Sequence, residues 1–181
     1  MKRNTWDKSQ LKWREFKEED WKSVHEYASQ PIVCTYQPWG PNTIDDSKAF
    51  VDQVIKDREI DHRTRFAFAI LYKEKVIGTG ELNIDDAVNL AGVISYILHP
   101  GYWGKGLGTE VANRLLQYGF KEMGLHRICA TCDPGNTGSA RILTKVGMKK
   151  EGRMRENLYM KDGWRDSLLF SVLEHEWTDP F

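Results

Sequence analysis

The chain has 181 residues, a length typical of one domain. Its 26 Lys and Arg are balanced by 26 Asp and Glu, so it lacks the cation surplus with which proteins bind nucleic-acid phosphates or anionic membranes. No apolar run approaches the roughly 20 residues that span a bilayer. The segment from Met1 to Arg14 is polar and lacks the apolar core of a signal peptide. We expect a single cytoplasmic domain over residues 1–181, with neither nucleic acid nor membrane as a partner.

The three cysteines do not imply a disulfide framework. Cys129 and Cys132 form a C-x-x-C, the spacing of half a zinc site or of a redox pair. Residues 127–132 are predicted to form a strand, however, and side chains three apart on a strand point to opposite faces. No second pair of ligands lies nearby to complete four-fold coordination. We therefore predict no metal site.

The first half of the chain predicts two helices and three strands. Trp21, Val24 and Ala28 recur at helical spacing, and Thr43 followed by Asp46 resembles the capping box of a helix start. The predicted elements are a strand over 11–16, a helix over 20–30 that Pro31 ends, a loop from Pro31 to Pro41, a helix from Thr43 to about Arg58, and strands over 66–72 and 76–84 joined by a turn at 73–75.

The second half has the stronger pattern. Val93 to Leu98 is β-prone and ends before Pro100, and a glycine-rich segment then leads into a helix with an apolar stripe. The predicted elements are strands over 93–98 and 127–132, helices over 107–123 and 137–146, and two final strands over 149–160 and 165–173 joined by an Asp162-Gly163 hairpin turn. This order is that of a mixed α/β (α+β) domain.

The glycine-rich segment is the clearest chemical signal in the sequence. A helix start presents backbone N–H groups that lack partners within the helix, and the helix dipole adds partial positive charge there. Glycines allow a ligand to approach that backbone closely. A strand, a glycine loop and a helix in succession therefore predict an anion site, most naturally for a pyrophosphate.

Two common nucleotide motifs do not fit this segment. A Walker A loop has Lys and then Ser or Thr after its last glycine, whereas Leu107 and Gly108 follow Gly106 here. The Rossmann spacing G-x-G-x-x-G is one residue longer than the spacing of the glycines at 104, 106 and 108, and it belongs to the first βαβ unit of a chain. A glycine-loop nucleotide-binding module without transfer chemistry stays an alternative.

Tyr102 to Glu110, Y-W-G-K-G-L-G-T-E, resembles the acetyl-CoA pyrophosphate loop, [QR]-x-x-G-x-[GA], of the GNAT superfamily of N-acetyltransferases. Trp103 replaces the usual Gln or Arg, as is common in the branch that resembles RimJ and RimL, the ribosomal-protein N-terminal acetyltransferases. Asn136 to Met148 resembles that branch's N-x-x-S-x-x-[VL]-x-x-K-[LV]-G-[FM], and Trp13 to Trp21 resembles its L-R-x-[LF]-x-x-x-D start.

The resemblance implies a GNAT fold: a mostly antiparallel sheet of six or seven strands, splayed at its centre between the strands at 93–98 and 127–132, with about four helices. Acetyl-CoA is the implied co-substrate, with no metal. Its pantetheine arm is expected along the backbone near Ile97, Leu98 and His99. The residues expected to hold its pyrophosphate are Trp103, Gly104, Lys105, Gly106, Leu107, Gly108 and Thr109, with Asn136 at the pantetheine amides or thiol.

The catalytic groups are less fully specified. The tyrosine that many members carry seven residues after the motif asparagine falls at Leu143. The RimL-like branch instead has a serine three residues after that asparagine, and the resemblance implies that this residue, Ser139, assists the leaving thiolate. The carboxylates that serve as the base in other members fall near Gly92-Val93 and near Leu158. Glu81 is the first alternative and Glu156 the second, and transfer without a dedicated base, with water taking the proton, stays open.

The implied reaction is direct acetyl transfer to a primary amine in a ternary complex. A protein N-terminal α-amine is the leading acceptor; a small-molecule amine (antibiotic, polyamine or amino acid) is the alternative. Trp39 and Tyr36, in the loop between the first two helices, are expected to contact the acceptor. A non-catalytic acyl-CoA-binding sensor is the rival from another class. A monomer or a homodimer is compatible with the sequence.

Overall fold

The computed structural model describes residues 6–181, so the polar segment that starts at Met1 begins outside the described residues. The α-helices are α1 (Trp21–Ala28), α2 (Pro31–Cys34), α3 (Ile44–Asp57), α4 (Leu107–Gln117) and α5 (Thr137–Lys145). The strands are β1 (Leu11–Glu15), β2 (Arg65–Tyr72), β3 (Lys75–Asp86), β4 (Ala91–Leu98), β5 (Arg127–Cys132), β6 (Lys149–Met160) and β7 (Gly163–Leu173). Among these described residues, no helix combines the length and apolar character needed to cross a membrane.

All seven strands belong to one sheet with the order β1-β2-β3-β4-β5-β7-β6. Neighbouring strands are antiparallel except for β4 and β5, which are parallel. The prediction of a mostly antiparallel sheet of six or seven strands is confirmed. The expected number of helices, about four, is exceeded by the short α2.

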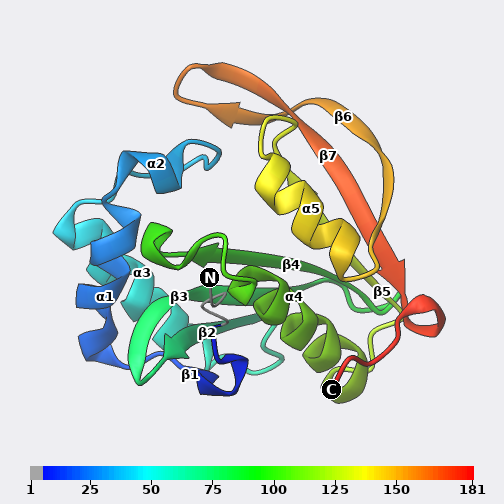
Figure 1. Ribbon diagram of the computed structural model, residues 1–181, viewed down its shortest axis with the longest axis horizontal. Coiled ribbons are helices and arrows are strands. Elements are labelled where there is room, and N and C mark those ends of the chain that lie inside the picture. The colour runs from blue at the N-terminus through cyan, green and yellow to red at the C-terminus, as the bar shows by residue number, and fades with distance from the viewer. Residues whose placement is uncertain (1–5) are drawn as a thin grey trace, which may run out of the picture.

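The sheet opens at its centre. β4 and β5 pair only where Ala91–Val93 lie beside Arg127–Cys129. Beyond Val93 the two strands diverge, as Figure 1 shows between the green β4 and the yellow-green β5. The splay expected between these strands is therefore present, and no strand of the described residues pairs with the second half of β4 on that side.

Two hydrophobic cores hold the helices on opposite faces of the sheet, and β2 contributes to both by the alternation of a strand. Ala67, Ala69 and Leu71 pack in the core that contains α1 and α3, whereas Phe68 and Ile70 pack in the core that contains α4. Burial on both faces explains why this strand is apolar almost throughout. The arrangement holds β3 and β4, which line the cavity described below, between two packed layers.

Local sequence signals account for the start of α3 and for the turn between β2 and β3. Thr43 caps α3, because its hydroxyl accepts the Asp46 N–H and the Asp46 carboxylate accepts the Thr43 N–H. The turn between β2 and β3 is shorter than predicted: only Lys73 and Glu74 form it, both with positive φ, which matches the twist of a tight hairpin. Lys75 already belongs to β3.

The prediction of an uninterrupted loop from Pro31 to Pro41 is wrong at its start. Pro31 begins the four-residue helix α2, whose Val33 and Cys34 are buried. Proline is well suited to the first position of a helix, since its fixed φ is helical and its missing N–H would have no partner there. The proline that ends α1 thus also starts the next helix.

Candidate active site

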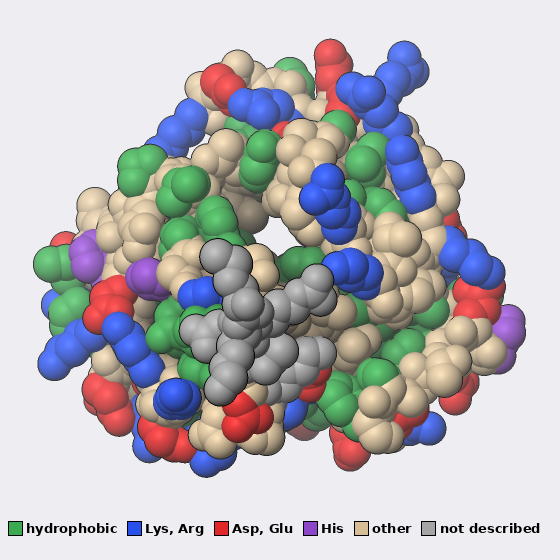
Figure 2. All heavy atoms as spheres, viewed as in Figure 1, with side chains coloured by type: hydrophobic (Ala, Val, Ile, Leu, Met, Phe, Trp, Pro, Cys, Tyr) green, Lys and Arg blue, Asp and Glu red, His purple; other side chains and the backbone are tan. Residues whose placement is uncertain are grey.

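A cavity of about 1430 Å³ lies where β4 and β5 part. In Figure 2 it shows as an opening near the middle of the face, and the opening passes through the molecule. Its walls come from segments far apart in the chain: the stretch from α1 to α3, strands β3 and β4, the glycine loop, and the start of α5. A passage with two ends can admit two substrates from opposite sides.

The glycine loop forms one end of this passage. Gly104 and Gly106 have φ of 71° and 78°, values that cost other residues about 1–2 kcal/mol. Gly106 is the N-cap of α4, so the first N–H groups of the helix face outward at the loop. Beside them Gly108 allows α5 to approach, since a Cβ there would lie 2.8 Å from Ile142 Cδ1.

Most residues predicted to bind acetyl-CoA line the cavity. They are Ile97, Leu98, Trp103, Gly104, Gly106, Gly108, Thr109 and Asn136. The indole N–H of Trp103 donates to the Leu98 carbonyl at 2.7 Å, which ties the loop to the end of β4. This is a structural use of the residue that replaces the usual Gln or Arg.

Three of the predicted residues lie outside the cavity lining. Leu107 is fully buried in the core, and the His99 N–H donates to the Ile77 carbonyl at 2.7 Å. The Lys105 ammonium lies 4.0 Å from the centre of the Trp6 ring and donates to the Gly101 carbonyl. A cation over an indole face is held there by electrostatic attraction, so in this structure Lys105 is engaged away from the cavity.

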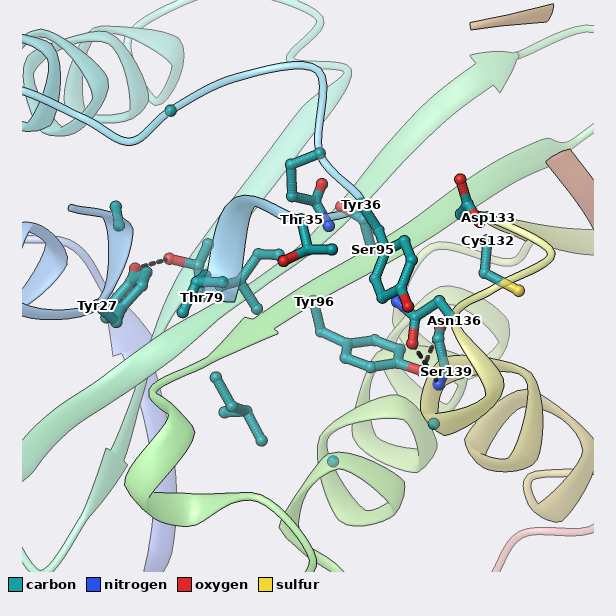
Figure 3. A pocket seen from close by; sticks show the side chains of 18 of the residues that line it. Tyr27, Thr35, Tyr36, Thr79, Ser95, Tyr96, Cys132, Asp133, Asn136 and Ser139 are labelled. Atoms are coloured by element: carbon teal, nitrogen blue, oxygen red, sulfur yellow. Dashed lines mark hydrogen bonds between the residues drawn. The ribbon is translucent and has the colours of Figure 1, made fainter. Parts of the chain in front are cut away.

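Ser139 lies in the first turn of α5, as expected, and contacts Asn136 there. The Asn136 side chain caps the helix by accepting the Ser139 N–H at 3.0 Å. The Ser139 hydroxyl lies 3.4 Å from the Tyr96 hydroxyl, and Figure 3 shows both pointing into the same part of the cavity. Burial raises the pKa of the nearby Cys132 thiol, while the Ser139 hydroxyl acts in the opposite direction.

Glu81 lines the other side of the cavity and is paired. Both of its carboxylate oxygens accept hydrogen bonds from Arg65, at 2.9 and 3.2 Å. Arg65 also donates to Asp57 at 3.2 Å. Across the sheet register Glu81 faces Ser95 of β4, so the carboxylate lies beside the strand along which acetyl-CoA is expected.

Glu156, the second candidate base, is not brought to this cavity. It lies at an irregularity in β6 with a positive φ, and its N–H donates to the Asp166 carboxylate at 2.9 Å. Its side chain is exposed and lines a separate, smaller hollow with Arg155 and Asp166. Glu156 is therefore not placed to take a proton from an amine bound in the larger cavity.

Trp39 and Tyr36 both line the cavity, on the segment that follows α2. This segment is tied across the passage at two points. The Tyr36 hydroxyl donates to the Gly135 carbonyl at 3.1 Å, and the Lys161 ammonium donates to the Gly40 carbonyl at 2.6 Å. The two links join the segment after α2 to the residues between β5 and α5 and to the turn between β6 and β7.

Sequence reasoning missed Tyr96, Arg65 and Cys132 as lining residues. Tyr96 stands in an apolar run that is typical of a core strand, and Arg65 precedes the predicted start of its strand. Cys132 could have been found: the alternation Ile128, Ala130, Cys132 puts its side chain on the buried face. Within residues 6–181 no group of three or more His, Cys, Asp or Glu side chains is arranged to hold a metal ion.

Comparison with known proteins identifies the family. The model of the acetyltransferase (GNAT) domain matches residues 10–149. The uncharacterised N-acetyltransferase YnaD of Bacillus subtilis is 36% identical over 172 residues, covering 91% of this chain and 94% of YnaD. The chain therefore belongs to the GNAT family of N-acetyltransferases, enzymes that use acetyl-CoA.

Solved structures agree with this assignment. A GNAT-family acetyltransferase from Bacillus anthracis has a TM-score of 0.81 and 33% identity, covering 92% of this chain and 96% of that one. A ribosomal-protein-S5-alanine acetyltransferase from Vibrio fischeri has a TM-score of 0.78 and 29% identity, covering 93% and 96%. A curated relative with another acceptor, the spermidine N(1)-acetyltransferase of Escherichia coli, is 24% identical over 168 residues, 92% of this chain and 88% of that one.

Proposed function

We propose that this enzyme acetylates the α-amine at the N-terminus of a protein, by direct transfer while acetyl-CoA and acceptor are both bound. Acetyl-CoA supplies an activated acetyl group as a thioester. The glycine loop and the start of α4 would hold its pyrophosphate, because their N–H groups and the helix dipole favour an anion. The open second half of β4 would hold the pantetheine arm.

The observation that carries the choice of acceptor is the charge of the cavity wall. Among residues 6–181, the charged residues that line the cavity are three carboxylates and four cations: Asp46, Glu81, Asp133, Arg65, Arg141, Lys145 and Lys161. The carboxylates are engaged, Glu81 with Arg65, Asp133 with Arg165, and Asp46 with the Thr43 cap.

A polyamine carries several positive charges, so a cavity that binds it gains most from unpaired carboxylates. The wall described above offers neither an acidic surplus nor a bare carboxylate among its charged residues. An α-amine brings one positive charge and loses it before it attacks. The similarity to a ribosomal-protein-S5-alanine acetyltransferase supports the same choice.

In this mechanism Glu81 accepts the proton that the acceptor amine gives up, directly or through a water molecule. Arg65 holds the carboxylate in place by its two hydrogen bonds, a geometry that fixes direction as well as distance. Ser139 assists the departing sulfur from the other wall. Trp39 and Tyr36 frame the entry of the acceptor.

A small-molecule amine with a single charge is the second candidate, favoured by one observation. The two links from Tyr36 to Gly135 and from Lys161 to Gly40 cross the passage and narrow the space through which a polypeptide would enter. Under this alternative the links stay closed during turnover.

A thiol-release assay with acetyl-CoA tests the proposal. The acceptor panel would hold peptides with N-terminal Ala, Ser or Thr, the same peptides with a blocked N-terminus, spermidine, aminoglycosides and free amino acids. We expect turnover of the free peptides at kcat/KM above about 10³ M⁻¹s⁻¹, an order below typical enzymes, and none of the blocked ones. Turnover of spermidine or another small amine alone would overturn the choice of acceptor. Acetyl-CoA binding without turnover of any amine would favour the sensor alternative.

A further inference from the structure

Two hydroxyl groups from opposite walls of the cavity meet beside the expected position of the thioester. Tyr96 belongs to β4 and Ser139 to α5, the elements on either side of the opening in the sheet, and their oxygens are 3.4 Å apart. Figure 3 shows the Tyr96 ring reaching across the cavity toward Ser139 and Asn136. The two residues are 43 positions apart in the chain, so only the fold pairs them.

Tyr96 supplies a phenol to the cavity from β4, whereas α5 has a leucine at the position where a tyrosine would serve. At the α5 position where a tyrosine would serve, Leu143 is buried to 1% exposure and also lines the cavity. The phenol of Tyr96 arrives from the facing strand instead. Burial raises the pKa of Tyr96 to about 12, so the group stays protonated and remains a hydrogen-bond donor throughout the working range of an enzyme.

The chemistry of the two groups sets the direction of their hydrogen bond. A phenol is a stronger acid than an alkyl alcohol and is the better donor of the pair. When Tyr96 donates to the Ser139 oxygen, the Ser139 O–H is left to donate elsewhere. Ser139 is held in place by the cap to Asn136 and lies in the first turn of α5, where the helix dipole favours negative charge.

We propose that Tyr96 is a positioning residue for acetyl transfer: its phenol orients the Ser139 hydroxyl so that Ser139 donates a hydrogen bond to the thioester sulfur of acetyl-CoA. This inference rests on the proposed function. In the transfer a C–N bond forms and the C–S bond breaks. The sulfur leaves with the bonding electron pair while Ser139 stabilises its developing charge.

The proton balance does not involve Tyr96. The amine nitrogen loses one proton to Glu81 or water, and the sulfur takes one from solvent as CoA is released. Tyr96 keeps its own proton, because a buried phenol is a weaker acid than an alkyl thiol such as that of cysteine. Its contribution is direction and polarisation of the Ser139 hydroxyl.

The decisive readout is the acidity of the thiol of bound CoA, followed by the ultraviolet absorbance of the thiolate as pH is raised. We expect Ser139→Ala to lower the acid dissociation constant of the bound thiol by about 10-fold and Tyr96→Phe by about 3- to 10-fold, the range of a single hydrogen bond. In the Ser139→Ala background, Tyr96→Phe should have no further effect, since the two act as one unit.

Turnover should follow the same pattern. We expect Tyr96→Phe to lower kcat by about 10-fold and to leave the Kd for acetyl-CoA within about 2-fold, because the ring and its packing are kept. Tyr27→Phe is the matched control for thiol acidity. It removes a buried phenol that bonds the Thr79 hydroxyl at 2.6 Å on the other wall of the cavity, and the acidity of bound CoA should not change.

The outcomes separate the inference from the function on which it rests. Equal effects of Tyr96→Phe in the wild-type and Ser139→Ala backgrounds, or no effect in either, would overturn the pairing. A wild-type protein that acetylates peptides while Tyr96→Phe leaves thiol acidity unchanged would keep the proposed function and remove the inference. If the acidity of the bound thiol responds as expected but the protein acetylates no amine, the pairing of Tyr96 with Ser139 is supported and the proposed function is contradicted.

Discussion

The two ends of the cavity are built in different ways. The end proposed to bind acetyl-CoA, hereafter the acetyl-CoA end, is made largely of backbone: the glycine loop, the first turn of α4 and the open edge of β4 lie close together in the chain. The end proposed to bind the amine, hereafter the acceptor end, is made of side chains from distant elements, such as Arg65 with Glu81 and Tyr36 with Gly135. Backbone recognition suits a substrate that every family member shares. Side chains can change one at a time, and so can the acceptor.

The largest expected effect is the loss of acetyl-CoA affinity when the glycine loop is altered. Gly106→Val should weaken acetyl-CoA binding by about 100-fold or more, since a side chain at φ 78° displaces at least two N–H groups that would each contribute about 1.5–3 kcal/mol to a charged ligand. Isothermal titration calorimetry with acetyl-CoA measures this.

Gly124→Val is its matched control. Gly124 lies between α4 and β5 with φ 62°, and a Cβ at this position would meet no atom of the described residues within 4 Å. The variant therefore carries the same backbone strain without contact to the loop. Similar losses of affinity in both variants would mean that strain, not the loss of the anion site, explains the first result.

Glu81→Gln addresses the proton at the acceptor end. We expect kcat to fall by about 10- to 100-fold, at the low end for general bases, with acetyl-CoA affinity unchanged. Asp57→Asn removes another carboxylate partner of Arg65 and should lower kcat far less. Unaltered turnover in Glu81→Gln would favour water as the proton acceptor.

Trp39→Ala probes the side-chain contacts of the acceptor. The expected result is a rise of about 10-fold in the KM for a peptide, equivalent to about 1.4 kcal/mol, while the Kd for acetyl-CoA stays the same. Trp164→Ala, at an exposed indole that does not line the cavity, should change neither. A loss of acetyl-CoA affinity in Trp39→Ala would contradict the claim that Trp39 contacts the acceptor and not acetyl-CoA.

The smallest effect concerns the link across the passage. Tyr36→Phe removes the hydrogen bond to the Gly135 carbonyl, whose net contribution is about 1 kcal/mol. If the link narrows the entry, the KM for a peptide should fall by up to about 5-fold while that for a small amine rises. Steady-state kinetics with both acceptors tests this, and equal shifts for both would remove the link from acceptor selection.

The elements that form the glycine-loop end of the cavity could be predicted because their signals are local. The run from Val93 to the glycines and into the helix at Leu107 lies in one window of sequence, and Asn136 and Ser139 lie within four residues. Short β-prone runs bounded by turn residues likewise predicted the strands. The short α2 was not predicted, because four residues are too few to show a helical period.

The acceptor end could not be assembled in this way. Arg65 reaches Glu81 because the antiparallel register sets Ala67 opposite Glu81. The sequence of either strand alone does not determine this register. Tyr96 reaches Ser139 because the sheet opens where α5 packs over it. Such pairs depend on how several elements pack against one another. The sequence therefore identifies candidate residues, and the fold determines which of them come into contact.

One equilibrium measurement tests the central claim, that a single passage joins acetyl-CoA to a singly charged protein α-amine. CoA would be joined through its sulfur and an acetyl bridge to the α-nitrogen of an N-terminal alanyl tripeptide, with a spermidine conjugate for comparison. Because each conjugate fills both ends at once, the peptide conjugate should bind at least about 100-fold more tightly than CoA, and the spermidine conjugate no more tightly than CoA. A spermidine conjugate that binds more tightly than the peptide conjugate would contradict the account.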